Sequence, residues 1–250
     1  MGRIYSLTAA ESERLKRAIA GCLVNPFIDD ILDFNWEAVW HYCKGLTLPD
    51  PLTKTRKKYL HDAIDHKRKI GWSLKTQQIS CPISDCKSYA VVIARADIFG
   101  RADRLGFPGL SVKSRPEDLA RAVLKIWGTK VQTDKKIQNV RESRMATLLK
   151  APRRTEFAVH ETDLEVYDPR DLKWVWGKNG KGFWALEKKT KRQVYRWYPS
   201  GGQLFEIFQV PPKILSINLE WRRLDAERVL GKLEELTGSL EHLVDERRKR

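Results

Sequence analysis

The chain has 250 residues, a formal net charge of +15 and a pI near 9.7, and 42% of its residues are hydrophobic. This length allows one large domain or two smaller ones with a sizeable core. Nine Trp, eight Phe and seven Tyr argue against a disordered chain, and no apolar run approaches the ~18 residues of a transmembrane helix. The positive charge predicts a polyanionic partner, and DNA or RNA is favoured over an anionic membrane because no basic amphipathic helix stands out.

The first expected element is a helix over residues 7–23. Thr8 and Glu11 have the spacing of a capping box, in which each residue bonds the backbone N–H of the other. Apolar residues follow at helical intervals, namely Leu15, Ile19 and Leu23. Asn25-Pro26 then predicts a break.

A second helix is expected from about Asp33 to Lys44, with Gly45 as its stop. It carries Glu37 between Trp36 and Trp40. A carboxylate in aromatic surroundings is either a charge at the edge of the core or a pre-positioned ligand, and both interpretations remain open.

The segment from Asp65 to Thr76 is predicted to be a β-hairpin. Its second strand alternates Ile70, Trp72 and Leu74 with Gly71, Ser73 and Lys75, which is the period of a strand with one buried face. We expect the turn to bring Asp65 close to Ser73 and Lys75. A carboxylate and a lysine fixed on a sheet can hold a divalent metal ion and a water beside a phosphate. The alternative is an ordinary amphipathic hairpin with solvated charges.

The hairpin lies in a basic stretch and is followed by an apolar one. From Lys54 to Lys75 there are eight Lys and Arg residues against two Asp, which predicts a positive patch. The continuous apolar run Tyr89–Ala94 predicts a central strand that is buried on both faces.

Two further helices are expected, at about Pro116–Trp127 and about Asp134–Leu149. The second would present four cations to phosphates, namely Lys135, Lys136, Arg141 and Arg144. Between Lys113 and Arg154, twelve Lys and Arg residues stand against four Asp and Glu. We therefore favour a nucleic-acid footprint here over a merely solvated helical face.

From Thr155 to Pro212 the pattern is that of β-structure. The expected strands are 156–161, 164–167, 173–176, 183–186, 194–198 and 204–210. The turn Gly177–Gly182 predicts a hairpin. Donors and acceptors suited to reading DNA bases lie on this scaffold, namely Lys178, Asn179, Arg196 and Gln203. Alternatively, these strands only build a second core layer.

A last helix is expected over residues 220–246. Its apolar residues are spaced by three and four, and they are Ala226, Val229, Leu233, Leu236, Leu240 and Leu243. This seam either docks on the body of the protein or pairs with a second copy, which would make the protein a homodimer.

Together the elements predict an α+β fold with an α/β core, in which helices flank a mixed central sheet. A β-rich region and a terminal helix follow. We expect residues 1–150 to form the core with the N-terminal helices and residues 151–250 to form the recognition region, although one compact domain is also possible. The four cysteines lack a Cys-x-x-Cys pair, which favours reduced thiols in a cytoplasmic protein over a zinc site.

The order of these elements resembles the PD-(D/E)XK nuclease superfamily, and most nearly type II restriction endonucleases. The resemblance covers roughly residues 30–130: a helix with Glu37, an acid at Asp65, and Ser73-Leu74-Lys75 on the next strand. It implies site-specific, Mg²⁺-dependent cleavage of double-stranded DNA in a restriction-modification system. By this resemblance Asp65 and the Leu74 carbonyl would bind Mg²⁺, and Lys75 would orient or deprotonate the attacking water.

The chain departs from the family pattern at two positions. Ile64 stands where the family has Pro, and Ser73 stands where it has the second acid. Glu37 is the candidate that replaces this acid as a metal ligand. Two other functions remain open: a sequence-specific DNA-binding protein in which Ser73 marks a lost active site, and a metal-independent enzyme such as a DNA glycosylase.

Overall fold

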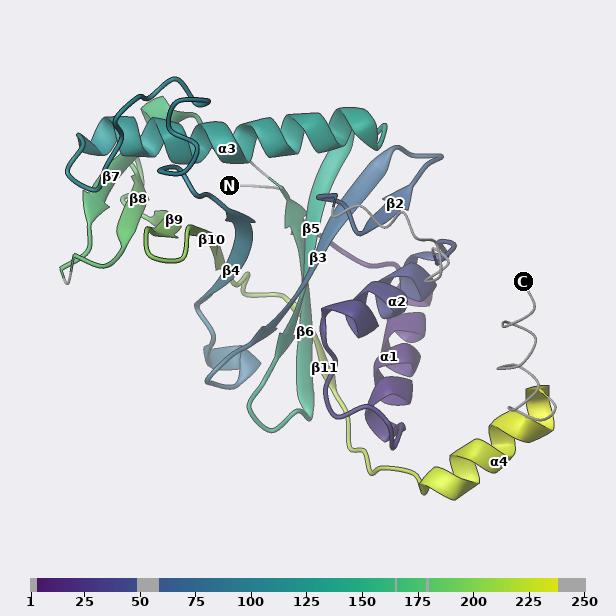
Figure 1. The fold of residues 1–250 in the computed structure, drawn as a ribbon. Coiled ribbons are helices and arrows are strands. Elements are labelled where there is room, and N and C mark those ends of the chain that lie inside the picture. The colour runs from purple at the N-terminus through teal and green to yellow at the C-terminus, as the bar shows by residue number, and fades with distance from the viewer. Residues whose placement is uncertain (1–3, 49–58, 165, 179, 238–250) are drawn as a thin grey trace. The chain divides into compact units, whose positions relative to one another are not determined.

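The computed structural model describes residues 4–48, 59–164, 166–178 and 180–237 (Figure 1). The chain divides into two compact units. Unit 1 comprises residues 1–6 and 49–216, and unit 2 comprises residues 7–48 and 217–250. Residue 150, near which a boundary was predicted, lies within unit 1. We describe each unit by itself.

Unit 1 contains a mixed sheet whose long strands are β3 (Ile70–Gln78), β5 (Glu142–Lys150) and β6 (Glu156–Asp163). The strand order is β1-β6-β5-β3-β2, where β1 is Ile4–Tyr5 and β2 is Ala63–Asp65. β11 (Leu215–Asn218) also pairs with β6. β3 and β5 pair in parallel, whereas the pairs β1–β6, β2–β3 and β5–β6 are antiparallel. The mixed sheet and the helices confirm the predicted α+β class.

The second helix expected at 134–149 is wrong. One helix, α3 (Pro116–Ile137), covers the first part of this stretch, and β5 forms the rest. Asn139 between them has a φ of 52°, a left-handed conformation that Asn tolerates and that ends the helix. Residues 145–150 are all buried in the sheet, so tertiary pairing with β3 overrides the helix propensity of Met, Ala and Leu.

The second sheet of unit 1 is antiparallel, with the order β4-β10-β9-β8-β7. Its strands are β4 (Ser88–Arg95), β7 (Leu172–Trp176), β8 (Phe183–Glu187), β9 (Gln193–Tyr198) and β10 (Gln203–Gln209). Four strands predicted after residue 172 are thus confirmed, whereas residues 164, 166 and 167 are not in a strand. β4 lies at the sheet edge with Val92 37% exposed, so the prediction of a doubly buried central strand is wrong.

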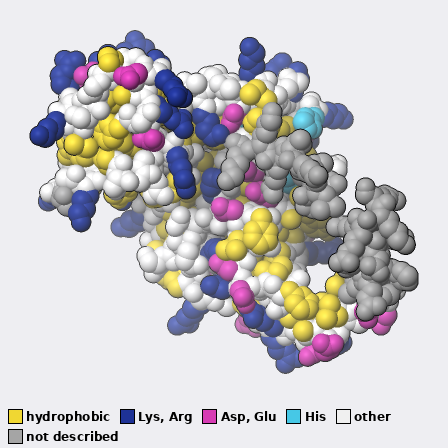
Figure 2. Space-filling model, in the orientation of Figure 1, with side chains coloured by type: hydrophobic (Ala, Val, Ile, Leu, Met, Phe, Trp, Pro, Cys, Tyr) yellow, Lys and Arg dark blue, Asp and Glu magenta, His cyan; other side chains and the backbone are white. Residues whose placement is uncertain are grey.

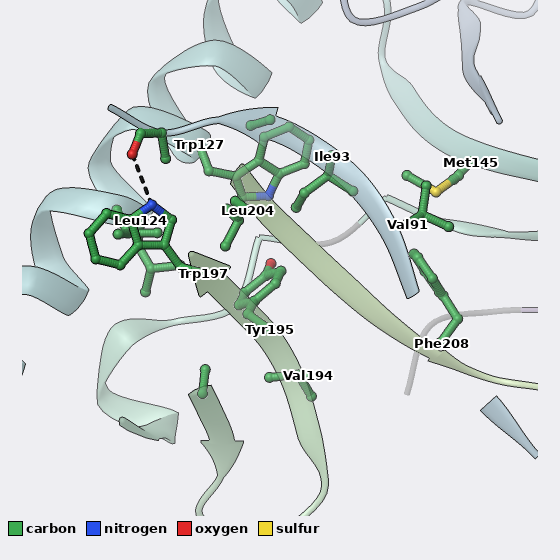
Figure 3. Packing of buried hydrophobic residues seen from close by; sticks show 14 of the residues in the cluster. Val91, Ile93, Leu124, Trp127, Met145, Val194, Tyr195, Trp197, Leu204 and Phe208 are labelled. Atoms are coloured by element: carbon green, nitrogen blue, oxygen red, sulfur yellow. Dashed lines mark hydrogen bonds between the residues drawn. The ribbon is translucent and has the colours of Figure 1, made fainter. Parts of the chain in front are cut away.

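The core of unit 1 joins α3 to the inner face of the second sheet (Figure 3). Trp127 of α3 and Trp197 of β9 are both fully buried, and Trp197 Nε1 donates to the Ala96 carbonyl at 2.9 Å. Tyr195 and Phe183 are buried in the same cluster. The aromatic residues of this sheet therefore divide into an inner set, which includes the half-buried Trp176 beside Phe183, and a half-buried outer set, which consists of Trp184, Tyr198 and Phe205.

Unit 2 contains the helices α1 (Ala9–Val24), α2 (Asp33–Lys44) and α4 (Ala226–Thr237). The capping box is confirmed, because Thr8 Oγ1 accepts from the Glu11 N–H at 3.2 Å and Glu11 Oε2 accepts from the Thr8 N–H at 2.8 Å. α4 has no buried residue, and Leu236 is 74% exposed. Residues 220–225 of the predicted terminal helix are not helical, and residues 238–246 lie outside the described part.

Two short 3-10 helices, Ile83–Asp85 and Pro169–Asp171, complete the elements. Among the described residues, no helix has the length and apolar composition that crossing a bilayer requires.

Candidate functional site

The strand pairing puts Asp65 on the other face of the sheet from Ser73 and Lys75. β2 and β3 pair antiparallel, with Asp65 opposite Ile70 and Ala63 opposite Trp72. Cross-strand partners share a face, so Asp65 lies on the side of Ile70 and Trp72. This contradicts the predicted placement of Asp65, because the turn over residues 66–69 gives it the register of the apolar set.

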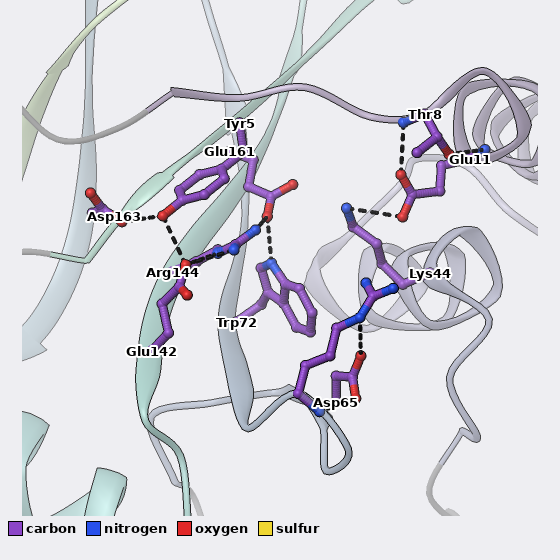
Figure 4. Close-up of polar contacts among 11 residues, drawn as sticks. Tyr5, Thr8, Glu11, Lys44, Asp65, Trp72, Glu142, Arg144, Glu161 and Asp163 are labelled. Carbon is purple, nitrogen blue, oxygen red and sulfur yellow. Dashed lines mark hydrogen bonds and ion pairs between the residues drawn. The ribbon is translucent and has the colours of Figure 1, made fainter.

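Asp65 instead stabilises the hairpin turn (Figure 4). Its Oδ1 accepts from the Arg68 N–H at 2.9 Å, and its Oδ2 lies 3.7 Å from the Arg68 guanidinium. Lys69, at the end of the turn, has a φ of 58°. A non-glycine residue in this conformation needs support from its surroundings, and an Asp that bonds the backbone of its own turn provides it.

The acid that reaches Ser73-Leu74-Lys75 is Asp62. Its Oδ2 accepts from the Leu74 N–H at 2.8 Å, and its own N–H donates to the Trp72 carbonyl at 2.8 Å. β2 begins only at Ala63, so the side chain of Asp62 occupies the edge of β3 where a further strand residue would pair. In a strand, the N–H and C=O of one residue point to the same side. The Leu74 carbonyl is therefore directed toward the edge that the Asp62 carboxylate occupies.

Ser73 and Lys75 lie on the face of the sheet that contains a buried polar row. Lys75 pairs with Thr147 on β5, and Thr147 pairs with His160 on β6. Ser73 is only 3% exposed, whereas Lys75 is half-buried. The hydroxyl of Tyr89 lies 2.8 Å from His160 Nδ1. Burial lowers the pKa of His160 to about 4 and raises the pKa of Tyr89.

The opposite face carries an ion-pair network centred on Arg144 (Figure 4). Its guanidinium contacts Glu161 Oε1 at 2.8 Å and Glu142 Oε1 at 2.6 Å. Trp72 Nε1 donates to the same Glu161 oxygen at 2.7 Å. Arg144 was expected to contact DNA phosphates from a helix, but its side chain is 14% exposed on β5 and binds these carboxylates.

Tyr5 completes this network from β1. Its hydroxyl lies 2.8 Å from Glu142 Oε1 and 2.6 Å from Asp163 Oδ1, and the Arg144 guanidinium lies 3.5 Å from the centre of its ring. Burial and the two carboxylates raise the pKa of Tyr5. Burial alone would raise the pKa of Glu142, but hydrogen bonds from Arg144 and Tyr5 outweigh it and lower that pKa. The network binds the N-terminal strand to the sheet and is structural.

A buried His–Ser pair, which the sequence did not single out, supports the residue next to Asp62. His61 Nε2 lies 2.9 Å from Ser143 Oγ, and His61 Nδ1 lies 2.7 Å from Gln138 Oε1. A Cβ on Gly71 would come within 2.6 Å of the His61 ring, so the strand approaches the ring closely only because this residue is Gly. The pair fixes the backbone at residue 61 against α3 and β5, and it thereby helps to position Asp62.

The other predicted site residues are dispersed. Lys136 and Arg141 are exposed and Lys135 is half-buried near the C-terminal end of α3. Lys178 and Gln203 are exposed on the second sheet, Arg196 is half-buried there, and Asn179 lies outside the described residues. Glu37 is half-buried on α2 and belongs to unit 2, so the structure does not relate it to Asp62 or Asp65.

The described residues contain no group of three or more His, Cys, Asp or Glu side chains arranged to hold a metal ion. Mg²⁺ does not require such a group, because it keeps several waters and is commonly bound through one or two carboxylates plus substrate phosphates. The Asp62 carboxylate and the Leu74 carbonyl are hard oxygen donors of this kind. Both groups are thus of the type that Mg²⁺ takes as ligands.

The chain was compared with protein-family models, with curated proteins and with solved structures. None of these comparisons gave a significant match.

Proposed function

We propose that this protein is a Mg²⁺-dependent, site-specific endonuclease of double-stranded DNA, of the type II restriction class. The observation that carries the proposal is the 2.8 Å hydrogen bond from the Leu74 N–H to Asp62 Oδ2, which brings a carboxylate to the strand edge at Ser73-Leu74-Lys75. The net charge of +15 supports a polyanionic substrate.

Each group at this edge has a distinct task in hydrolysis of a phosphodiester. Asp62 and the Leu74 carbonyl would hold the metal ion, and Mg²⁺, when bound, would supply a Lewis acid for the scissile phosphate. Lys75 follows Leu74 directly, and its ammonium orients the attacking water and stabilises the charge that develops on the phosphate oxygens. Asp62 takes over the role expected of Asp65, because the Asp62 carboxylate lies at this strand edge whereas Asp65 bonds its own turn. Ser73 is buried and has no metal-binding role in the proposal.

The cations that remain available for DNA phosphates lie near the C-terminal end of α3. They are Lys135, Lys136 and Arg141, since Arg144 is engaged with carboxylates. Phosphate contacts of this kind fix the position of the protein on DNA without selecting a sequence.

We further propose a cytoplasmic homodimer that pairs through α4. The exposed side chains of Leu233 (41%) and Leu236 (74%) support this pairing, because a solvent-exposed apolar stripe of a helix favours association. A two-fold protein matches a palindromic DNA site. The four free cysteines are consistent with a reducing compartment.

A second candidate is a DNA-binding protein without catalysis. Ser73 favours this candidate, because it stands where the nuclease family has its second acid and is only 3% exposed.

Cleavage of plasmid DNA with Mg²⁺ or with EDTA tests the proposal. Discrete fragments that appear only with Mg²⁺ support a site-specific endonuclease, and sequencing their ends identifies the site. Gel retardation without cleavage supports the non-catalytic protein instead. Cleavage or base loss in EDTA contradicts the proposal and indicates a metal-independent enzyme such as a glycosylase.

A further inference from the structure

The second sheet of unit 1 has an outer face, opposite its core, with an aligned row of side chains. Trp184 on β8 pairs with Arg196 on β9, and Arg196 pairs with Phe205 on β10. Cross-strand partners share a face, so these three side chains lie side by side. Tyr198, two residues beyond Arg196, is on the same face. We call Trp184, Arg196, Tyr198 and Phe205 the aromatic platform.

The side chains of the platform contact one another, yet all four remain half-buried. The Arg196 guanidinium lies 5.6 Å from the centre of the Trp184 ring. Arg196 Nη1 donates to the Tyr198 hydroxyl at 3.3 Å. The rings of Tyr198 and Phe205 meet edge to face at 5.6 Å. The platform is thus an assembled surface of rings and one guanidinium plane.

Gly177 and Gly182 leave room for the Trp184 ring. A Cβ on Gly177 would come within 2.8 Å of this ring, and a Cβ on Gly182 would come within 2.9 Å of its Nε1. The turn between β7 and β8 therefore lies directly against the indole. Its exposed lysines, Lys178 and Lys181, are carried at the same end of the sheet as the platform.

The strands and turns that carry the platform are strongly basic. Residues 172–204 contain eight Lys and Arg residues and a single acid, Glu187. Figure 2 shows Lys and Arg side chains, with a few Asp and Glu side chains, around hydrophobic ones on the part of unit 1 that contains β7, β8 and β9. Glu187 lies 4.0 Å from Arg192, so its charge is balanced locally. The platform is accordingly surrounded by positive charge.

We propose that the aromatic platform binds single-stranded nucleic acid, with bases stacked on the rings and phosphates held by the surrounding lysines. Proteins that bind unpaired strands without sequence preference combine aromatic rings, on which the bases stack, with a basic groove that follows the backbone. The Arg196 plane adds a cation–π surface for a base. Duplex DNA cannot use the platform in this way, because its bases are already stacked on one another. The site is separate from the edge of β3 and does not depend on the proposed nuclease activity.

The test uses fluorescence anisotropy in EDTA, where metal-dependent cleavage cannot consume the probe. The probes are an oligothymidine of about 20 nucleotides, a matched abasic strand with the same phosphates, and a duplex of equal length. We expect the oligothymidine to bind at least about tenfold more tightly than the abasic strand, because stacking contributes about 1–3 kcal/mol per base. Equal affinity for the two strands would show binding by charge alone and would overturn the proposal.

Variants locate the site on the platform. Tyr198→Leu and Phe205→Leu remove a ring but keep an apolar side chain, and each should weaken oligothymidine binding about tenfold while duplex binding is unchanged. Ile207→Leu, on the same strand as Phe205 and half-buried, is the matched control and should bind normally. A circular dichroism spectrum confirms the fold of each variant. Unchanged oligothymidine binding in both folded ring variants, or an equal loss on strand and duplex, would overturn the assignment.

Discussion

The buried Glu161 on the mixed sheet is balanced by neighbouring side chains. The Glu161 side chain is 1% exposed, and Arg144 and Trp72 supply its hydrogen bonds. A buried ion pair contributes little when intact, but removal of one partner leaves the other charge uncompensated. The stability of this sheet therefore depends more on Arg144 than it would on an arginine at the surface.

Arg144→Ala should lower the free energy of unfolding by ~3–5 kcal/mol, because Glu161 would remain buried without its cation. Chemical denaturation measures the change. The control is Arg170→Ala, since Arg170 is 89% exposed and pairs with Asp168 at the surface, and it should be nearly neutral. A loss for Arg144→Ala no larger than for Arg170→Ala would contradict the structural role of the network.

His160 should make the protein less stable in mild acid. Burial holds its pKa at about 4, so above pH 6.5 both the folded and the unfolded chain carry a neutral imidazole. As the pH falls from 6.5 toward 4, the unfolded chain binds a proton that the folded chain does not, and stability is lost. The loss from this residue should reach about 2 kcal/mol at about pH 5.

Urea unfolding at about pH 7 and about pH 5 measures this dependence. His61, whose pKa burial also lowers, adds to it with the same sign. His160→Gln should reduce the difference in the free energy of unfolding between the two pH values. An unchanged difference in His160→Gln would show that His160 titrates normally.

At the scale of elements, sequence signals between near neighbours predicted local structure correctly. They failed where pairing between distant strands determines the structure. The capping box at Thr8 and Glu11 and the turn Gly177–Gly182 depend on neighbours in sequence, and both predictions are confirmed. β5 was predicted as a helix because its own residues do not reveal that it pairs with β3. β4 and α3 lie between these two strands in the chain. Likewise, the acid beside Lys75 could not be chosen from sequence, since a shift of the hairpin register exchanges the two faces.

Gly71→Ala should destabilise the β2–β3 hairpin where it packs on His61. The added Cβ would lie 2.6 Å from the His61 ring and 2.9 Å from Val140, so overpacking should cost ~1–3 kcal/mol. The matched control is Gly128→Ala in α3, where the nearest atom is 3.7 Å away and Ala is the better helix former. Thermal unfolding compares the two variants. An equal or smaller loss for Gly71→Ala would contradict the close approach.

The whole molecule is proposed to act as a dimer. Removal of the residues after 225 deletes α4, whose apolar side chains are exposed. Light scattering should give a dimer for the full chain and a monomer for the truncated one. A monomeric full chain at micromolar concentration, with and without DNA, would contradict pairing through α4.

We propose that Asp62, and not Asp65, is the acid of the active site. The two carboxylates are three residues apart and differ in their contacts, since Asp62 bonds the Leu74 N–H and Asp65 bonds its own turn. Lys75→Ala provides the reference for loss of the site and should lower cleavage at least ~10²-fold.

The decisive measurement is the plasmid cleavage rate in Mg²⁺ of Asp62→Asn beside that of Asp65→Asn. Each substitution keeps the size of the side chain and its ability to accept a hydrogen bond, so both proteins should fold and should bind DNA in Ca²⁺. We predict that Asp62→Asn loses at least ~10²-fold in rate, like Lys75→Ala, and that Asp65→Asn cleaves within about threefold of the wild type. Near-normal cleavage by Asp62→Asn together with loss of cleavage by Asp65→Asn would contradict the site.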